Sequence, residues 1–301
     1  MKAFYSDTFV LPLPPGHRFP MAKYSQLRER IVTEAILSAD QLNESPRASR
    51  EYLLRVHTPD YLDRVTEGRL TDKEIRRIGF PWSPGMVERS KRSVGGTIAA
   101  VHAAFENGVG LNLAGGTHHA RADSGAGFCV FNDVAVAARA AQAEGLAKRV
   151  LLLDCDVHQG DGTAEIFAGD PSVFTFSIHG AKNYPFNKVS GDLDIALPNG
   201  TGDAEYLDIL KEAAWRALAL ANPDLVIYLS GADPFHGDSF GRLSLTKAGL
   251  RERDRWVLST LAEAELPTAV VMGGGYARQI KDIVDIHLGT VAEALRAWSI
   301  G

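Results

Sequence analysis

The strongest chemical signal in the chain is a run of acidic and imidazole side chains, Asp154-Cys155-Asp156-Val157-His158-Gln159-Gly160-Asp161. It follows an apolar stretch, Arg149–Leu153, that predicts a buried strand. Because side chains alternate along a strand, Asp154, Asp156 and His158 are expected on one face. Burying so much carboxylate beside an imidazole is costly unless a cation neutralises it. The run therefore predicts a catalytic metal site at the end of this strand.

Other apolar stretches, bounded by Gly, Asp or Pro, predict further strands. Most are rich in leucine or β-branched residues and lack polar alternation, which is typical of strands covered on both faces. The strands predicted in this way are Lys2–Tyr5, Gly110–Ala114, Val150–Asp154, Val173–Ile178, Leu225–Ser230 and Thr268–Met272.

Helical patterns lie between these strands. They are a long helix from Ser83-Pro84 through Phe105, Asp133–Glu144 capped by Asn132, Ala204–Ala221 capped by Asp203, Lys247–Glu263 capped by Thr246, Lys281–Trp298, and a shorter helix from Thr58-Pro59. Alternating strands and helices predict an α/β fold with a mainly parallel central sheet and helices on both faces. The stretch 181–202 is expected to be a long loop at a functional rim.

The composition narrows the class of protein. The chain has 301 residues and a formal net charge of -5, with no long basic or acidic run, so we expect no nucleic-acid or membrane partner. No window offers the ~20 apolar residues of a membrane span, and the first residues lack the apolar core of a signal peptide. Two cysteines, Cys129 and Cys155, do not indicate a disulfide framework. We expect a soluble cytoplasmic protein with one domain over residues 1–301.

Polar residues or glycine loops follow five of the predicted strands. These clusters are Gly115–Ala120, Asp154–Asp161, Ser177–His179, Gly231–Pro234 and Gly273–Tyr276. In open α/β sheets, ligands bind beyond the carboxyl ends of the strands. The clusters are therefore expected to meet at one edge of the sheet and form one site.

At these residues the chain resembles the histone deacetylase superfamily, which shares the arginase-like α/β fold. The motifs that carry the resemblance are GGTHHA at 115–120, GFCVFND at 127–133, LDCDVHQGDGT at 153–163, SGADPF at 230–235 and GGGY at 273–276. An upstream block, Gly79–Pro84 with Glu88–Ser90 and Ser93–Thr97, resembles the class IV branch and its bacterial relatives. The resemblance covers nearly the whole chain and implies a zinc-dependent amidohydrolase. Its substrate would be acylated lysine in a peptide or protein, or a small acylated amine.

The resemblance implies that Asp156, His158 and Asp233 hold zinc. Zinc accepts carboxylate oxygen and imidazole nitrogen, and a catalytic zinc site keeps positions open for water and substrate. Iron(II) is the alternative metal. Taken alone, Asp156 and His158 could equally cap a strand end, and Asp233 could be an ordinary turn residue before Pro234.

The resemblance also implies the catalytic groups. His119, backed by Asp161, is expected to move protons between a metal-activated water and the leaving amine. His118, backed by Asp154, is expected to orient the water electrostatically. Tyr276 is expected to polarise the substrate carbonyl and then bind the oxyanion. Without the resemblance, His118 and His119 could equally lie in a solvated loop, and Tyr276 could be an ordinary residue of the hydrophobic core.

Further implied residues line a substrate tunnel or hold structural ions. The expected tunnel residues are Gly127, Phe128, Phe240, Tyr184 and Phe186, with Lys23 or Tyr24 near the inner end of the acyl channel. Two potassium or sodium sites are implied. One would use Asp154, the main-chain oxygens of Asp156 and His158, and Ser177 with Ile178, and the other Phe167, Asp170 and Val173.

Alternative functions share parts of this pattern. An arginase-like ureohydrolase needs two metals and a further Asp two residues after its DxH histidine, where this chain has Gly160. An acetylpolyamine amidohydrolase and a non-catalytic acyl-lysine binding module would both be compatible with the same set of site residues. Cys129 is flanked by Phe128 and Val130, which is typical of a buried, inert thiol rather than a nucleophile. A dinucleotide fingerprint fails because Leu113 stands at its third glycine.

Overall fold

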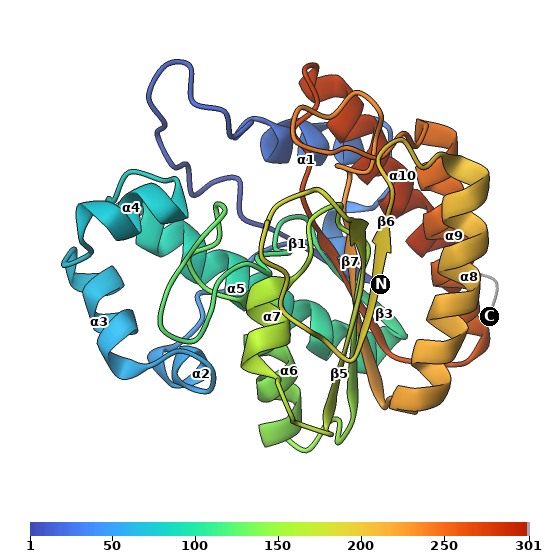
Figure 1. Cartoon of the computed structure of the whole chain (residues 1–301), viewed down its shortest axis with the longest axis horizontal. Coiled ribbons are helices and arrows are strands. Elements are labelled where there is room, and N and C mark those ends of the chain that lie inside the picture. The colour runs from blue at the N-terminus through green and yellow to red at the C-terminus, as the bar shows by residue number, and fades with distance from the viewer. Residues whose placement is uncertain (300–301) are drawn as a thin grey trace.

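A single eight-stranded sheet, in the order β2-β1-β3-β8-β7-β4-β5-β6, forms the centre of the molecule (Figure 1). The structure, a computed structural model, describes residues 1–299. Every neighbouring pair of strands is parallel, so the mainly parallel sheet expected from the sequence is confirmed. The strands are β1 (Lys2–Tyr5), β2 (Leu42–Glu44), β3 (Val109–Asn112), β4 (Val150–Asp154), β5 (Val173–Gly180), β6 (Leu193–Leu197), β7 (Leu225–Ser230) and β8 (Thr268–Met272).

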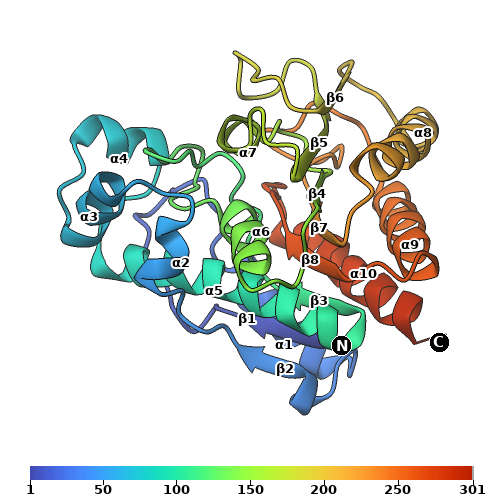
Figure 2. The same ribbon diagram turned by 90° about the horizontal axis from the view of Figure 1, so that it is seen from below.

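Helices cover both faces of the sheet, as expected (Figure 2). One face carries α1 (Lys23–Thr33), α8 (Asp203–Ala221), α9 (Lys247–Glu263) and α10 (Ile280–Trp298). The other face carries α2 (Arg50–Leu54), α3 (Pro59–Glu67), α4 (Asp72–Ile78), α5 (Pro84–Asn107), α6 (Asp133–Ala143) and α7 (Asp161–Ile166). A short 3-10 helix, η1, spans Ala39–Gln41. None of the helices among the described residues is long and apolar enough to cross a membrane.

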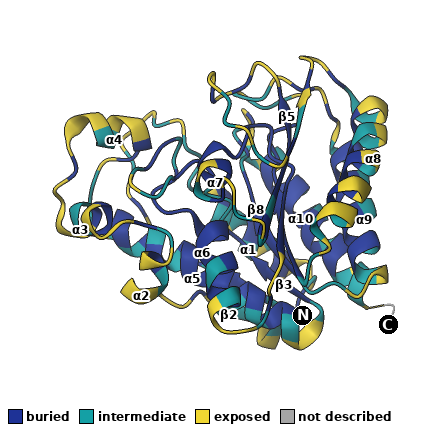
Figure 3. Cartoon of the chain, turned by 60° about the horizontal axis from the view of Figure 1, so that its bottom comes forward, coloured by how far each residue is buried: buried dark blue, intermediate teal, exposed yellow. Residues whose placement is uncertain are grey.

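Two hydrophobic cores, one on each face, explain why the central strands lack polar alternation. In β4, Leu151 and Leu153 join the core under α8 to α10, while Val150 and Leu152 join the core under α5 and α6. Figure 3 shows the central strands as a fully buried layer. Burying each of these side chains stabilises the fold by about 1.5–3 kcal/mol. Both faces of each central strand must therefore be apolar.

The strand register aligns the carboxyl ends that carry the site. Asp154, the last residue of β4, pairs with Ser177 of β5 and with Leu229 of β7. Ser230, the last residue of β7, pairs with Met272, the last residue of β8. The segments that follow β4, β7 and β8 therefore leave the sheet at one edge.

Several local expectations need correction. β4 ends at Asp154, so Asp156 and His158 lie in bends beyond the strand and do not follow strand alternation. Helix α8 begins at Asp203 after Gly202, without a side-chain cap. The Asp203 carboxylate instead accepts hydrogen bonds from the backbone N–H and the hydroxyl of Thr246, which joins the start of α8 to the start of α9.

The remaining differences between the expected and the observed elements concern short helices and strands. The stretch 181–202, expected to be a loop, contains the edge strand β6, in which the two end residues Leu193 and Leu197 are buried while Ala196 is exposed. The sequence patterns also did not predict β2, α1, α2, α4 or α7, the longest of which has 11 residues. The predicted caps Asn132 and Thr246 are confirmed, because each side chain accepts the expected N–H near its helix start.

Candidate active site

Asp156, His158 and Asp233 form a buried cluster with the donor set of a metal site. One ligand atom from each lies within 4.8 Å of the other two, and of residues 1–299 these three form the one such group. His158 Nδ1 is 3.0 Å from Asp156 Oδ1 and 3.2 Å from Asp233 Oδ2. Asp233 Oδ2 makes no hydrogen bond of good geometry with the described residues. A buried carboxylate oxygen without a hydrogen-bond donor is energetically costly, and a bound cation would remove that cost. The cluster is therefore suited to hold a cation.

Backbone N–H groups orient both carboxylates of the cluster. Asp156 Oδ2 accepts the Gly274 N–H at 2.6 Å, and Asp233 Oδ1 accepts the Val157 N–H at 2.9 Å. A Cβ atom on Gly274 would lie 1.8 Å from Asp233 Oδ2, so only glycine fits at this position. The glycines of the GGGY segment therefore let the β8 loop pack directly against the acidic cluster.

The electrostatics of the cluster also favour a bound cation. Burial by itself lowers the pKa of His158, but the hydrogen bond with Asp156 and the negative charges of Asp156 and Asp233 outweigh it and raise the pKa to about 10. Burial and the charge of Asp156 raise the pKa of Asp233 to about 7. Two carboxylates in a dry site thus bind positive charge strongly, and a divalent ion would supply that charge in place of protons.

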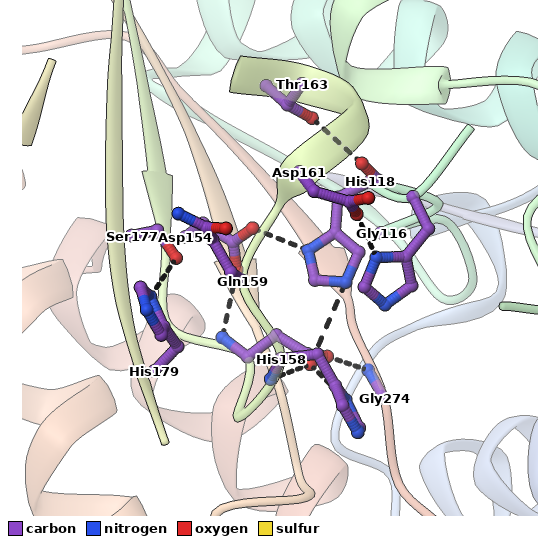
Figure 4. Close-up of polar contacts among 12 residues, drawn as sticks. Gly116, His118, Asp154, His158, Gln159, Asp161, Thr163, Ser177, His179 and Gly274 are labelled. Carbon is purple, nitrogen blue, oxygen red and sulfur yellow. Dashed lines mark hydrogen bonds and ion pairs between the residues drawn. The ribbon is translucent and has the colours of Figure 1, made fainter. Parts of the chain in front are cut away.

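Each histidine of the adjacent pair has its own carboxylate, and Figure 4 shows Asp154 beside His118. His118 Nδ1 lies 2.6 Å from Asp154 Oδ2, and His119 Nδ1 lies 2.6 Å from Asp161 Oδ1. A carboxylate can only accept, so Nδ1 of each ring carries the proton and donates it. In the neutral tautomer, Nε2 is then the atom free to take up a proton. The structure brings together both pairs that the resemblance implied.

The two imidazoles differ in charge. Burial by itself lowers the pKa of His118, but the charges of Asp154 and Asp156 outweigh it and raise the pKa to about 9. Burial, followed by the positive charge of His118, lowers the pKa of His119 to about 4. At neutral pH, His118 is therefore cationic and His119 is neutral. Of the two, His119 is the one that can accept a proton.

Tyr276 lies on the loop after β8 and faces the same space. Its backbone N–H donates to Asp238 Oδ2 at 2.6 Å, and its ring centroid is 4.9 Å from that of Phe240. Burial, followed by the charge of Asp156, raises the pKa of the phenol well above its ordinary value. The hydroxyl therefore keeps its proton and is a hydrogen-bond donor throughout the neutral range.

A cavity of about 430 Å³ reaches His119, His158 and Tyr276. It is lined by His119, Gly127, Phe128, His158, Lys182, Asn183, Tyr184, Phe186, Ser239, Phe240, Gly241, Arg242 and Tyr276. Every residue expected in the tunnel wall is among them. The sequence did not indicate Lys182, Asn183, Ser239, Gly241 or Arg242, because polar loop residues carry no local signal of lining a cavity.

Residues behind the cavity also occupy defined places. Lys23 is buried, its ammonium donates to the Gly275 carbonyl at 3.4 Å, and it lies 5.4 Å from the centre of the Tyr276 ring. Tyr24 and Phe128 both line a second, small cavity of about 40 Å³. Cys129 is buried, and burial raises the pKa of its thiol well above the ordinary value. A thiol in that state is a poor nucleophile.

The residues expected at the two monovalent-cation sites make the following contacts. The Asp154 carboxylate binds His118 and the backbone N–H of Asp156, and Ser177 Oγ lies 3.0 Å from His179 Nδ1. Ile178 is buried beside them in β5. The second set lies in one turn, where the Asp170 N–H donates to Phe167 O and the Val173 N–H donates to Asp170 O. Both cation sites stay predictions.

Comparisons with known proteins agree on one family. A family profile described as the histone deacetylase domain matches residues 17–291. A Picosynechococcus protein whose name calls it uncharacterized is 47% identical over 283 residues, covering 94% of this chain and 94% of that protein. Histone deacetylase 2 of Arabidopsis thaliana is 32% identical over 296 residues, covering 93% of this chain and 76% of the plant protein.

The solved structures extend the agreement to the fold. A crystal structure of an HDAC homologue from Aquifex aeolicus matches with a TM-score of 0.83 and 23% sequence identity. The match covers 99% of this chain and 88% of that chain. At this level of identity the likeness bears on the arrangement of the sheet and helices alone.

Proposed function

This chain belongs to the histone deacetylase family, and from that premise we propose that it is a metal-dependent hydrolase of acylated amines, with acyl-lysine as the substrate. One observation carries the proposal. Three kinds of group meet at a single cavity: the buried Asp/His/Asp cluster through its His158, the imidazole of His119 and the phenol of Tyr276. Those are the parts that amide hydrolysis by water needs.

Asp156, His158 and Asp233 would hold the metal, with zinc proposed and iron(II) as the alternative. Two carboxylate donors and one imidazole suit zinc, and the absence of a fourth protein ligand from the cluster in residues 1–299 leaves room for water and substrate. Bound there, the ion would make water acidic at neutral pH and polarise the carbonyl of the substrate.

The remaining chemistry belongs to side chains of this chain. His119 Nε2 takes the proton of the attacking water, and Asp161 holds the ring in the required tautomer. The same nitrogen then delivers a proton to the leaving amine, which departs as the free amine beside a carboxylate. His118, held by Asp154, faces the same cluster and would orient the water electrostatically. The Tyr276 hydroxyl donates a hydrogen bond to the oxygen that was the carbonyl.

The shape of the cavity supports a long, apolar stem on the amine side of the scissile bond. Phe128 and Phe240 line it, and both rings also pack against Tyr276, at centroid distances of 5.8 Å and 4.9 Å. Aromatic walls bury methylene groups well and leave a polar peptide backbone or a charged head group outside. The butyl chain of lysine has that form.

A panel of acyl-lysine peptides and acetylated polyamines, read as kcat/KM, tests the proposal and ranks its substrates. Tyr276→Phe is the matched control, because it removes one hydroxyl and leaves the metal cluster in place. Its kcat is expected to fall about 10²–10³-fold while zinc stays bound, since one oxyanion donor is lost. Zinc content is measured by elemental analysis. Near-normal turnover by this variant would contradict the role given to the phenol.

The alternatives differ in what the same panel would reveal. A ureohydrolase needs a second metal, whereas the described residues form one group able to hold an ion. A pure acyl-lysine binding module would retain zinc and peptide but release no amine. The cytoplasmic location expected from the sequence stays a prediction.

A further inference from the structure

The mouth of the cavity carries cationic side chains that the proposed mechanism does not use. Lys182 and Arg242 line the cavity and are exposed. The exposed Arg18 extends this charge over the wall, since its guanidinium carbon lies 5.8 Å from the centre of the Phe240 ring. None of the described residues that line the cavity is acidic. The approach to the site is therefore locally positive.

A fourth exposed cation, Arg77, lies beside the wall residue Gly127. Its carbonyl accepts the N–H of Gly127, a wall residue, at 3.1 Å. Burial and the charge of Asp161 raise the pKa of Tyr184, and the charge of Arg77 acts against that rise. Arg77 thus lies within electrostatic reach of the rim.

These cations are not neutralised by neighbouring carboxylates. Within residues 1–299, none of the ion pairs includes Arg18, Arg77, Lys182 or Arg242. The whole chain has a formal net charge of -5, so the charge at the mouth opposes the charge of the molecule. A local field of this kind attracts anions to one place on an otherwise acidic surface.

The backbone that carries the rim cations is held in place by buried hydrogen bonds. Asn183, 2% exposed, donates from Nδ2 to the Phe240 carbonyl at 2.7 Å and accepts the Arg242 N–H at 3.2 Å. The Lys188 ammonium donates to the carbonyls of Asn183 and Pro185, each at 2.6 Å. The loops that bear Lys182 and Arg242 are therefore fixed to each other before a substrate arrives, which lowers the ordering cost of binding.

We propose that this cationic rim selects acyl-lysine within acidic segments of protein and disfavours basic segments and acylated polyamines. The inference rests on the proposed function and names the substrate class for it. Residues beside an acyl-lysine stay outside the cavity when its stem is inserted, within a Debye length of ~10 Å of the rim. Phe186, 81% exposed, offers an apolar surface at the same rim for a neighbouring peptide side chain.

The test uses the zinc-loaded protein and fluorescent acetyl-lysine peptides that differ only in their flanking residues. One peptide has Asp and Glu flanks, one has Ser and Gly, and one has Lys and Arg; an acetylated polyamine is the fourth probe. Affinity is measured by anisotropy for the peptides and by competition for the polyamine, and kcat/KM is measured in parallel. One exposed ion pair changes affinity by about two- to fivefold. Several pairs are expected to make the acidic peptide bind about tenfold or more tightly than the basic one, with the difference shrinking at high salt.

Charge reversal at the rim supplies the matched variants. Lys182→Glu with Arg242→Glu brings the summed charge of the four rim residues to zero and should remove the preference for the acidic peptide over the basic one. Arg216→Glu on α8, an exposed site away from the cavity lining, should leave that preference unchanged. Equal affinity for the peptides, or tighter binding of the basic peptide or the polyamine, would overturn the inference. Charge-dependent binding without turnover would support the rim but refute the hydrolase. Turnover without any dependence of affinity on peptide charge would support the hydrolase and refute the selective role of the rim.

Discussion

Replacing Arg253 with leucine should destabilise the protein and loosen the metal cluster together. The guanidinium is fully buried in α9, behind the loops that carry the cluster. Its Nη1 donates to the Gly231 carbonyl at 2.7 Å and to the Cys155 carbonyl at 3.3 Å. Those carbonyls lie in the short segments that follow β7 and β4 and lead to Asp233 and Asp156. Arg253 thus ties together the two chain segments that supply the acidic ligands.

The magnitude follows from what the substitution leaves behind. Arg253 Nη2 lies 2.9 Å from Asp254 Oδ1, and both side chains are buried. Asp254 also accepts the hydroxyls of Tyr228 and Thr290, each at 2.6 Å, so it cannot turn toward solvent without breaking them. Removing one partner of a buried ion pair costs about 3–5 kcal/mol. That is a large fraction of a total stability of ~5–15 kcal/mol. Looser support of metal ligands typically lowers metal affinity about 10–100-fold.

Urea unfolding of the zinc-free and zinc-loaded protein measures the first effect, and competition with a chromogenic chelator measures the second. Arg251→Leu is the matched control on the same helix. Its side chain is 57% exposed, and Glu293 keeps other arginine partners, so a loss below about 1 kcal/mol and unchanged zinc affinity are expected. If Arg253→Leu behaved like this control in both assays, the support assigned to the buried pair would be refuted.

Three further changes have outcomes that single measurements check. Asp233→Ala removes one donor, so elemental analysis should find little zinc; an undiminished zinc content would contradict the ligand assignment. Asp238→Ala frees the backbone N–H groups of Tyr276 and Phe240, held at 2.6 and 2.8 Å, and kcat should fall up to ~10²-fold while zinc stays bound; unchanged kcat would count against this tether. His57 accepts the Asn132 N–H while buried, and burial lowers its pKa from an ordinary 6.5 to about 4. The unfolded chain therefore binds the extra proton, and about 3 kcal/mol of stability should be lost as the pH falls from 6.5 to 4. Because the buried His119 has a similarly lowered pKa, urea unfolding at several pH values is done on the wild type and on His57→Gln, and the variant should lose about 3 kcal/mol less between pH 6.5 and 4. An equal loss in both proteins would contradict the contribution assigned to His57.

Local sequence determined the sheet and the chemical types at its edge. The apolar runs Val150–Asp154 and Leu225–Ser230 have no polar face, so burial on both sides is the arrangement that covers them, and both appear as strands with the expected bounds. The polar residues that follow such strands must emerge at a common edge when the strands are parallel. The residue types for metal binding could therefore be named before any contact was known, whereas the proton-transfer roles of His119 and Tyr276 came from the family resemblance.

Only the tertiary structure decided which charges compensate one another. The pairing of Arg253 with carbonyls beyond β4 and β7 joins segments that lie far apart in the chain, and no local pattern encodes it. The neutral state of His119 depends on its burial beside a cationic His118, which sequence spacing does not reveal. Asp203 gives a smaller example. The sequence favours it as the cap of α8, but its carboxylate instead accepts the backbone N–H of Thr246 at the start of α9. Periodicity reports the burial of a single element, whereas proximity across the fold depends on how all the elements pack.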